Sequence, residues 1–544
     1  LSASSLNTPP DKGVWCSVRT GRCVSSSPLL NWSGSFEAND EPGTWTFEGW
    51  LERGDMFEVR PSDRTLKVAR FAGGQVGTGE GAPQKVPGVA IHSATLQKIH
   101  RGPDRKAVYR NLFGELTLKS NGDWQTAKTW TKEPQEALTR LIKRLATRAY
   151  RRPVEDSQVE PYIELAKQEL ADGAPFVMAL RAGYRALLCS PRFLYFHEKP
   201  GRLDQFALAS RLSYFLWNSK PDAELLRAAE TGKLTEKWQV RKQVERMLAD
   251  DRGRDFVRNL AAEWLDLSLI NFTEPDRRLY RDFDIVVQQS MLDETHTFLQ
   301  TMLDEDVSVT GLIDSDFTFL NSRLARYYGV GKVTGDELKR VSLSDDSPRG
   351  GVLTQGAILK VTANGTNTSP VVRGVWIAER LLGEHIQPPP ENVPAIEPDI
   401  RGAKTIRDQL AKHRSIESCA SCHRSIDPPG FALENFDPSG KWRNNYLKLS
   451  GRRQIKGPRI NVGYTLADGR RFKNLNEFRS LVTSRPRKLA ANVAEKLLTY
   501  GTGGPVTFAD RADIQQIVNR SAESGYGFRT ILTNVVLSDA FQSK

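Results

Sequence analysis

The pentapeptide Cys419-Ala-Ser-Cys-His423 has the C-x-x-C-H spacing that attaches a haem covalently, and the surrounding chain has to accommodate that chemistry. Two thiols three positions apart meet the two vinyl groups of a c-type haem. The adjoining histidine then lies beneath the iron as its proximal ligand. The sequence therefore predicts one covalent haem c, attached at Cys419 and Cys422, with His423 as the axial ligand of the iron.

The same cysteine pair has two other interpretations, half of a zinc site and a thioredoxin-like redox pair. A structural zinc site needs a second close pair of Cys or His, and Cys189 is the only cysteine between Cys23 and Cys419. A thioredoxin pair follows a strand and opens a helix. This motif instead follows a helical pattern over 405–413 and precedes Asp427-Pro-Pro-Gly430, which predicts a loop. Covalent haem is the favoured interpretation, and the other two stay open.

The ligand on the other face of the iron is not evident from the sequence. Downstream of His423 the chain contains no Met, His or Cys, which excludes the distal methionine that small electron-transfer cytochromes take from that region. His413 would lie about 15 Å from His423 along a continuous helix, which is the wrong place to cross to the other haem face. Individually, the upstream candidates are each expected to be structural; they are His296, His385, His413, Met291 and Met302.

An iron without a second protein ligand would be open to peroxide, oxygen or a small substrate. Glu434, Asp437 and Arg443 would then be candidates for acid–base or charge-stabilising roles. For the two carboxylates we favour the alternative, hydrogen bonding that shapes the loop around the haem. Arg373 and Arg443 are also candidates to neutralise the haem propionates through paired donor geometry.

The length and composition indicate a multidomain protein. At 544 residues the chain is too long for a single hydrophobic core and is expected to divide into about three to five domains. Charged residues make up 26% of the chain, and no run of about 18 apolar residues predicts a transmembrane segment. The opening Leu1-Ser-Ala-Ser-Ser has neither an initiator Met nor a signal peptide, which indicates a processed or fragmentary N-terminus.

The remaining cysteines bear on the compartment. Cys16 and Cys23 are spaced for a small disulfide loop around a turn, which would contribute about 2–3 kcal/mol in the chain-entropy model. The alternative is two free thiols. Haem c is attached outside the cytoplasm, where a disulfide also persists. The two features together predict a periplasmic, secreted or cell-surface protein.

The positive charge is concentrated in one stretch. Residues 441–490 hold fourteen Lys or Arg against Asp468 and Glu477, and their net charge of +12 equals that of the whole chain. No nucleic-acid-binding motif accompanies the stretch, so nucleic acid is not expected as a partner. We expect it to dock an acidic redox partner or an anionic substrate; a solvated basic loop is the alternative.

Two hydropathy patterns divide the chain. Apolar and polar residues alternate over 44–55 and 65–74 between Gly-rich turns, which predicts strands of a partial β-sandwich. From about residue 133 the period becomes helical, and Leu138, Leu141 and Ile142 share one face of a predicted helix. The expected fold class is therefore mainly α and multidomain. Its parts are a β-rich domain over 1–125, helical domains over 133–200 and 204–345, the haem-bearing domain over 349–445, and a C-terminal helical domain over 464–544. Further helices are predicted over 284–303, 375–382, 489–500 and 528–537.

The haem motif belongs to a longer string that is similar to the signature of a known family. From Cys419 to Arg443 it reads C-x-x-C-H-x-x-I-D-P-x-G-F-A-L-E-N-F-D-x-x-G-x-W-R, and it resembles the planctomycete-type large c-type cytochromes. Further blocks occur in the order of that family. They are Arg152-Arg-Pro, Ser213-Tyr-Phe-Leu-Trp, Arg246-Met-Leu-Ala-Asp250, Asn321-x-Arg-Leu-Ala, Thr368-Ser-Pro-Val-x-Arg-Gly374 and Leu497-x-x-Tyr-Gly.

The resemblance implies tandem domains of unknown function with a C-terminal C-x-x-C-H motif, in a secreted or periplasmic haem protein often associated with polysaccharide-degrading gene neighbourhoods. It also implies a further cytochrome module, either upstream in a longer precursor or as a separate subunit. The stretch 446–459 and Gly503-Gly504 depart from the family's usual pattern, which bears on partner contacts more than on haem attachment.

Three functions are compatible with the sequence, in decreasing order of preference. The first is an extracytoplasmic monohaem c-type cytochrome that transfers electrons. The second, close behind it, is a haem-dependent oxidoreductase, peroxidase- or oxidase-like, with an open distal site. The third is a surface protein that binds glycan through its β-rich region.

Overall fold

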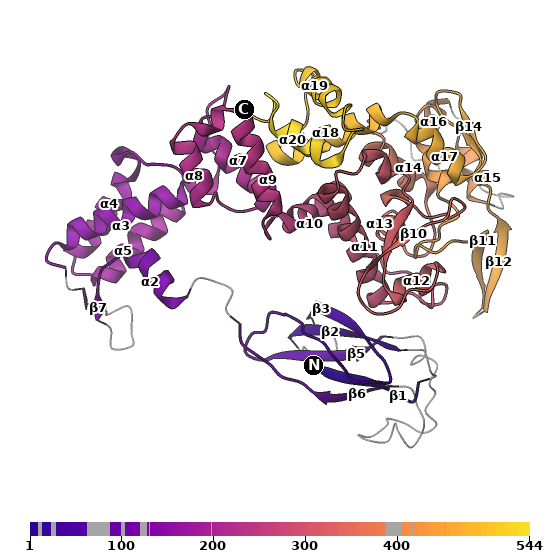
Figure 1. The fold of residues 1–544 in the computed structure, drawn as a ribbon, viewed down its shortest axis with the longest axis horizontal. Helices are drawn as coiled ribbons and strands as arrows, with labels where there is room; N and C mark the ends of the chain where they lie inside the picture. Colours follow the sequence, from indigo (N-terminus) through magenta and orange to yellow (C-terminus); the bar gives the residue numbers. More distant parts are fainter. Residues whose placement is uncertain are drawn as a thin grey trace. The chain divides into compact units, whose positions relative to one another are not determined.

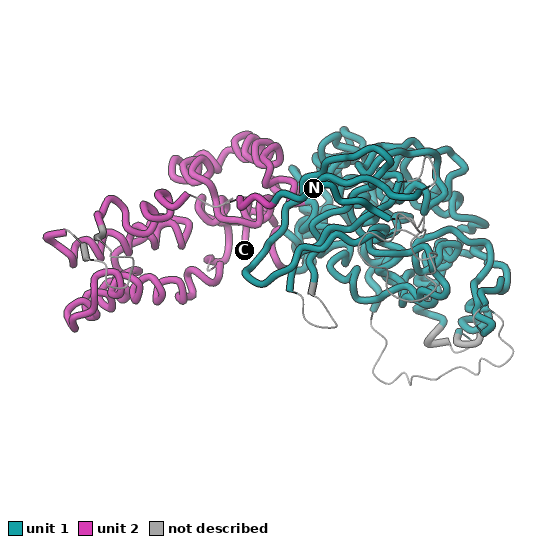
Figure 2. Tube along the Cα trace, turned by 90° about the horizontal axis from the view of Figure 1, so that it is seen from below, with its two compact units in different colours: residues 1–95, 257–500, 504–534 teal, residues 96–256, 501–503, 535–544 magenta. Residues whose placement is uncertain are grey.

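The computed structural model describes residues 1–8, 13–22, 29–62, 88–99, 104–119, 128–129, 131–196, 198–387, 405–414, 417–451 and 453–544. It is about 49% helical, with 19 helices and only small sheets in the described residues, which confirms the expected mainly α, multidomain fold (Figure 1). The chain divides into two compact units (Figure 2). Unit 1 comprises residues 1–95, 257–500 and 504–534, and unit 2 comprises residues 96–256, 501–503 and 535–544. Within the described ranges, no helix has the length and apolar character needed to cross a membrane.

The described strands near the N-terminus form two three-stranded antiparallel sheets, which confirms the β-sandwich-like segment. Ala3 of one sheet and Val14, Val18 and Phe36 of the other belong to one buried apolar cluster. The first sheet has the order β4 (Gly43–Thr44), β1 (Ser2–Leu6), β6 (Gly88–Ser93), and the second has the order β3 (Leu29–Ala38), β2 (Val14–Arg22), β5 (Asp55–Pro61).

The predicted strand over 44–55 is wrong for most of its length. Thr44 ends β4 and Asp55 begins β5, and residues 45–54 form no strand. Trp45 and Phe47 instead pack on Phe36, with ring centroids 4.5 and 5.9 Å away, so their alternation reflects core packing rather than strand pairing. The predicted strand over 65–74 lies outside the described residues. So does Cys23 of the proposed disulfide, while Cys16 is buried in β2.

Unit 2 begins with a helical group whose apolar faces pack together. Leu138, Leu141 and Ile142 are buried, as predicted, in a cluster with Val159, Ile163 and Leu180 of the next two helices. The elements of this unit are α2 (Arg105–Phe113), β7 (Leu118–Lys119), β8 (Lys128–Thr129), α3 (Pro134–Ala149), α4 (Asp156–Ala171), α5 (Phe176–Leu188), α6 (Pro191–Leu194), α7 (Gln205–Trp217), α8 (Ala223–Glu230), η2 (Lys233–Thr235) and α9 (Lys237–Ala249). Helix α10 (Gly253–Trp264) leads from unit 2 into unit 1.

The last residues of the chain return to unit 2. The amide of Leu203 donates to the carbonyl of Gln542 (2.9 Å), and the amides of Gly201 and Lys544 donate to each other's carbonyls (2.9 Å each). The guanidinium of Arg211 donates to the carbonyl of Phe541 (2.6 Å). Residues 535–544 are therefore an integral part of unit 2 rather than a tail.

Unit 1 holds the remaining helices and small antiparallel hairpins. Helix α11 (Ile285–Asp304) starts where predicted, because the Asp284 carboxylate accepts from the Val287 amide as an N-cap (3.0 Å). The other elements are η3 (Leu267–Leu269), η4 (Val309–Leu312), β9 (Phe317–Leu320), α12 (Ser322–Tyr328), β10 (Lys339–Ser342), η5 (Val352–Thr354), α13 (Gly356–Val361), α14 (Pro370–Arg380), α15 (Ile406–His413), α16 (Glu417–Ala432), β11 (Asn445–Ser450), β12 (Arg453–Arg459), β13 (Tyr464–Thr465), β14 (Arg471–Phe472), α17 (Leu475–Thr483), α18 (Pro486–Thr502), α19 (Arg511–Ser521) and α20 (Phe528–Val536).

Helices α14 and α16 pack backbone against backbone, and this contact positions the site. A Cβ atom on Gly374 would lie 1.9 Å from the carbonyl oxygen of Ile426, and one on Gly430 would lie 1.8 Å from that of Pro370. Only glycine fits at either crossing point. Because Pro370 faces Gly430 while Gly374 faces Ile426, the two helices are antiparallel. The C-terminal end of α14 is therefore directed toward the N-terminal half of α16.

Helix α14 begins five residues earlier than predicted. The Ser369 hydroxyl accepts from the Val372 amide (3.3 Å), and Pro370 occupies the first helical position, where its missing N–H is not needed. Residues 370–374, which precede the predicted helix, therefore form the first turn of α14.

Candidate functional site

The three residues of the haem motif lie on α16. Cys422 is half-buried and His423 is buried, at 8% exposure, while nothing is described of the side chain of Cys419. The loop predicted over Asp427-Pro-Pro-Gly430 is wrong, because α16 continues through both prolines to Ala432. A proline inside a helix removes a backbone hydrogen bond and costs about 3 kcal/mol. The close packing of α14 on this part of α16 is the interaction that offsets that cost.

Continuation of the helix brings Asp427 one turn below His423. The imidazole Nδ1 lies 2.7 Å from Oδ1 of the Asp427 carboxylate, which is fully buried. An ionised carboxylate only accepts hydrogen bonds, so this geometry suits an imidazole with its proton on Nδ1, and Nε2 would then be the nitrogen that binds a metal. The partner of His423 within the 427–430 segment is therefore the side chain of Asp427.

Two further residues hold Asp427 from the side away from His423. The Tyr464 hydroxyl donates to Asp427 Oδ2 (3.1 Å), and Nε of Arg414, at the end of α15, lies 3.5 Å from the same oxygen. The Tyr464 ring is stacked on Phe431 of α16 at 5.5 Å. Burial, followed by the charge of Asp427, raises the pKa of Tyr464 to about 12, so the phenol stays protonated and donates.

The side chains of this helix fit a covalent haem c. His423 has its second nitrogen fixed by a carboxylate, as is usual for histidines that bind a metal. Cys422 offers a thiol at the adjoining position, and the backbone of Cys419 lies one turn earlier on the same helix. Among the described side chains, Cys422 and the oriented His423 are therefore the groups that would hold a haem c on this helix.

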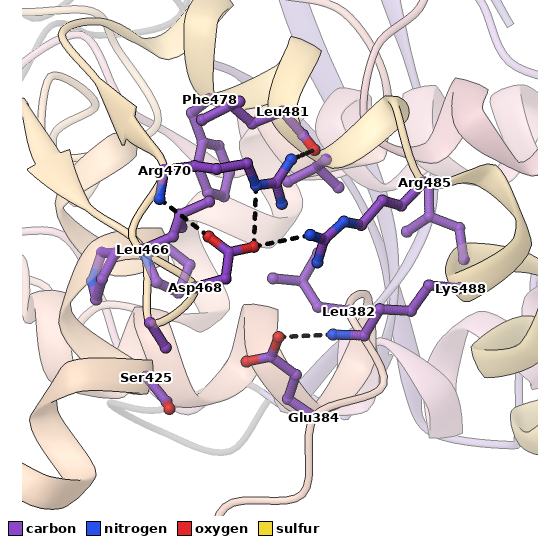
Figure 3. A pocket seen from close by; sticks show the side chains of 15 residues that line it. Leu382, Glu384, Ser425, Leu466, Asp468, Arg470, Phe478, Leu481, Arg485 and Lys488 are labelled. Atoms are coloured by element: carbon purple, nitrogen blue, oxygen red, sulfur yellow. Dashed lines mark hydrogen bonds and ion pairs between the residues drawn. The ribbon is translucent and has the colours of Figure 1, made fainter.

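An open cavity lies along α16 (Figure 3). Ser425 and Pro429 line it and follow Cys422 by three and seven positions, so they share its face of the helix. The far walls come from the segments 382–384 and 466–470 and from α17 and α18. Apolar residues dominate the lining; they are Leu382, Pro428, Pro429, Leu466, Ala467, Phe478, Leu481, Val482 and Leu489.

The charged residues that line this cavity form ion pairs with one another. Asp468 is bridged by Arg470 (2.9 Å) and Arg485 (3.0 Å), and Lys488 pairs with Glu384 (2.7 Å), as Figure 3 shows. Burial opposes ionisation of Asp468, but hydrogen bonds and charge from Arg470 and then Arg485 lower its pKa below the usual value. The cavity thus combines an apolar interior with paired charges.

The structure separates the five candidates for a second iron ligand. Met291 and Met302 are fully buried on α11, Met291 against Gly356 and Gly440 and Met302 near Gly311. His296 lies on the same helix, where burial and then Arg258 lower its pKa to about 4. His413 is on α15, and its side chain is outside the described part of the chain. His385 is exposed and directly follows Glu384, which shares the cavity with Ser425 of α16.

The carboxylates proposed for acid–base roles are engaged inside the protein. Glu434 is fully buried and accepts from the Thr368 hydroxyl and, at 3.2 Å, from Arg443. Asp437 accepts from the amide and hydroxyl of Ser439 (2.8 Å each). Burial raises the pKa of both carboxyls, against the lowering effect of these partners. This geometry supports the structural role that we favoured for them.

Arg373 is also enclosed by protein, so its guanidinium has no exposed surface that could contact a haem propionate. It is 0% exposed, and its guanidinium donates to the carbonyls of Leu433 (2.9 Å), Phe436 (3.2 Å) and Leu359 (3.2 Å). Burial lowers its pKa to about 10, in spite of the nearby Glu434. The interpretation of Arg373 as a propionate ligand is therefore wrong; it ties α14 to the segment that follows α16.

A second buried polar cluster was not anticipated. Glu294 of α11 accepts from the hydroxyls of Thr318 (2.6 Å) and Tyr328 (2.7 Å), and burial raises its pKa to about 7. The guanidinium of Arg349 lies over the Tyr328 ring at 3.3 Å and donates to the carbonyl of Gly440 (2.6 Å). The cluster links α11 to Gly440, which follows α16 in the sequence. No local sequence pattern predicts this cluster.

The basic stretch is partly neutralised within the fold. Arg470 and Arg485 share Asp468, and the other paired cations are Lys441 with Asp282, Arg443 with Glu434, Arg479 with Asp314 and Lys488 with Glu384. By contrast, Lys448, Arg453, Lys456 and Arg459 are exposed and make no ion pair with any described residue. All four belong to the β11–β12 hairpin.

The pairing register of the β11–β12 hairpin sorts these cations by face. Lys448 pairs with Ile455, which is 46% exposed, and Ser450 pairs with Arg453, so these four side chains lie on one face. On the opposite face, Gln454 donates to the carbonyl of Leu279 (2.9 Å) and anchors the hairpin. The free face therefore carries two cations around an exposed apolar residue.

The fold and the site define a mainly α, multidomain protein with a C-x-x-C-H helix. Four family models match the chain in tandem, each described as a protein of unknown function: DUF1595 over residues 137–198, DUF1592 over 203–330, DUF1588 over 349–446 and DUF1585 over 468–541. These are planctomycete domains associated with cytochrome-c-like proteins, and their succession fits the family that the sequence resembles. No curated protein and no solved structure matches the chain.

Proposed function

We propose that the protein is an extracytoplasmic monohaem c-type cytochrome that transfers electrons, with haem attached at Cys419 and Cys422 and bound at the iron by His423. The observation that carries the proposal is the 2.7 Å contact between His423 Nδ1 and the buried Asp427 carboxylate on the helix that also carries both cysteines. A metal-binding histidine almost always donates its other ring N–H to a carboxylate, a backbone carbonyl or a water, and the buried Asp427 carboxylate is such a partner.

The chain's own residues have distinct tasks in this function. Asp427 keeps the Nδ1 proton in place and so presents Nε2, while Tyr464 and Arg414 keep the carboxylate from turning away. The contacts of Gly374 and Gly430 hold α16 against α14. When bound, haem c would supply a one-electron iron couple. The apolar cavity beside Cys422 is suited to an apolar ring edge.

Covalent haem attachment is the direct test of this proposal. In cells that mature c-type cytochromes, the double variant Cys419→Ala/Cys422→Ala is expected to lose all covalent haem, because a thioether needs a cysteine sulfur. The measurement is the pyridine-haemochrome spectrum of protein from which non-covalent haem has been extracted. Cys189→Ala is the matched control, since this cysteine is exposed at the end of α5 and should leave the haem content unchanged. Haem content equal to wild type in the double variant would refute the proposal.

A haem-dependent oxidoreductase is the second candidate, and one observation favours it. A carboxylate partner makes a ligating histidine a stronger electron donor than a carbonyl partner does, and strong donation favours reactions at an open iron face. A six-coordinate, low-spin visible spectrum would support electron transfer. A high-spin spectrum that shifts with peroxide or cyanide would support the oxidoreductase.

We also propose that the partner is acidic and docks on the β11–β12 hairpin, a part of the basic stretch whose exposed Lys448, Arg453, Lys456 and Arg459 make no ion pair with a described residue. Unpaired exposed cations steer the approach of anions, whereas cations held in ion pairs contribute little.

Charge reversal on the hairpin is expected to slow its reaction with an anionic redox probe. In Lys448→Glu/Arg453→Glu/Lys456→Glu, oxidation of the reduced protein by hexacyanoferrate(III) should be about tenfold slower at low ionic strength, with a weaker salt dependence. Stopped-flow absorbance measures the rate. The cationic tris(phenanthroline)cobalt(III) should not be slowed. The same charge change on α9, in Lys237→Glu/Arg241→Glu/Lys242→Glu, is the control; an equal effect there would contradict hairpin docking.

A further inference from the structure

We infer that Asp427 is a positioning residue that lowers the reduction potential of the haem, through the hydrogen bond from His423, and that Tyr464 moderates this effect. The inference rests on the proposed haem attachment and specifies how the site would be tuned. It starts from three contacts of one carboxylate: His423 Nδ1 at 2.7 Å, the Tyr464 hydroxyl at 3.1 Å and Arg414 Nε at 3.5 Å.

The kind of acceptor determines how strongly the imidazole donates to a metal. A hydrogen bond to an ionised group is shorter and roughly twice as strong as one to a neutral carbonyl. A carboxylate at Nδ1 therefore pulls the proton further from the ring and increases the basicity of Nε2. A more basic axial ligand stabilises the ferric state over the ferrous state, and so lowers the potential.

Burial makes this effect large at Asp427. The carboxylate is 0% exposed and His423 is 8% exposed, so water does not screen the pair. The distance of 2.7 Å is at the short end for a charge-assisted bond, and the i,i+4 spacing on a rigid helix holds it there.

The contacts of Asp427 with Tyr464 and Arg414 oppose this effect and limit how strongly the His423 imidazole donates to a metal. The Tyr464 hydroxyl donates to Oδ2 and withdraws charge from the oxygen that faces His423, while Arg414 adds a positive charge on the same side. Removing the Tyr464 donor should therefore strengthen the His423–Asp427 bond. Asp427 and Tyr464 are thus predicted to act on the potential in opposite directions.

The test is a spectroelectrochemical titration of the holoprotein and three variants. Asp427→Asn keeps the shape but replaces the anion by an amide, and the potential should rise by about 59 mV, equivalent to a tenfold change in the ratio of ferrous to ferric stability. Tyr464→Phe should lower the potential. Asp251→Asn, which changes an exposed carboxylate of unit 2, is the control and should shift it much less.

The outcomes distinguish this inference from the proposal beneath it. Each variant is first assayed for covalent haem by the pyridine-haemochrome method. If wild type carries none, the proposed function fails. If all carry haem but Asp427→Asn keeps the wild-type potential, or both substitutions shift it in the same direction, Asp427 has only a structural role and the inference is overturned.

Discussion

Replacing Gly430 with alanine is expected to destabilise unit 1 by about 3 kcal/mol or more. The new methyl carbon would lie 1.8 Å from the carbonyl oxygen of Pro370 and 2.6 Å from its carbonyl carbon, so α14 and α16 would have to separate. Overpacking usually costs about 1–3 kcal/mol, and here the obstacle is backbone rather than a movable side chain. Alanine is otherwise the better helix former, so propensity alone would predict the opposite sign.

Calorimetric unfolding and hydrogen exchange of the α14 and α16 peptides measure this effect. Gly374→Ala, which would bring a methyl group 1.9 Å from the carbonyl oxygen of Ile426, should behave in the same way. Gly504→Ala is the matched control, because a methyl group added there would meet no atom within 4 Å. Unchanged exchange in both Gly374→Ala and Gly430→Ala would show that the helices do not cross as described.

Replacing Arg373 with methionine should destabilise the same part of the protein by about 3–5 kcal/mol. Methionine fills much of the volume but leaves the carbonyl oxygens of Leu433, Phe436 and Leu359 without their donor. It also leaves Glu434 with one cation fewer in a buried environment. Arg373→Lys keeps the charge but not the planar fork, and should retain only part of the stability.

The free energy of unfolding of these variants would be compared by chemical denaturation and by calorimetry. Arg453→Met, on the exposed face of the β11–β12 hairpin, makes the same chemical change without a buried partner, and should alter stability by less than about 0.5 kcal/mol. A loss below about 1 kcal/mol in Arg373→Met would mean that the enclosed guanidinium contributes little to holding α14 against the segment after α16.

The helices could be predicted because their signals are local. The apolar face of α3 and the N-cap of α11 each depend on residues that are close together in the sequence. Both helices occur where the periodicity predicted them. The strand predicted over 44–55 failed because alternation records only which side chains are buried. It does not record whether the backbone pairs, and Trp45 and Phe47 are packed on Phe36 without a ladder.

The site could be predicted only in part. The C-x-x-C-H motif predicts covalent haem attachment from its spacing alone. Pro428 and Pro429 predicted a loop, so the contact between His423 and Asp427 at i,i+4 of one helix was not expected. The helix persists because α14 packs closely on it at Gly374 and Gly430. These two glycines are 56 positions apart in the sequence, so no local stretch of sequence predicts the contact. Tyr464 and Arg414 likewise reach Asp427 from separate elements.

The return of residues 535–544 to unit 2 has a consequence for biosynthesis. The carbonyls that accept hydrogen bonds from Leu203 and Arg211 follow these donors by more than 300 residues, so unit 2 cannot close until residues 535–544 have been synthesised. The motif helix α16 is made more than 100 residues earlier. Removal of residues 535–544 would therefore leave the segment of α16 complete while depriving Gly201, Leu203 and Arg211 of their hydrogen-bond partners.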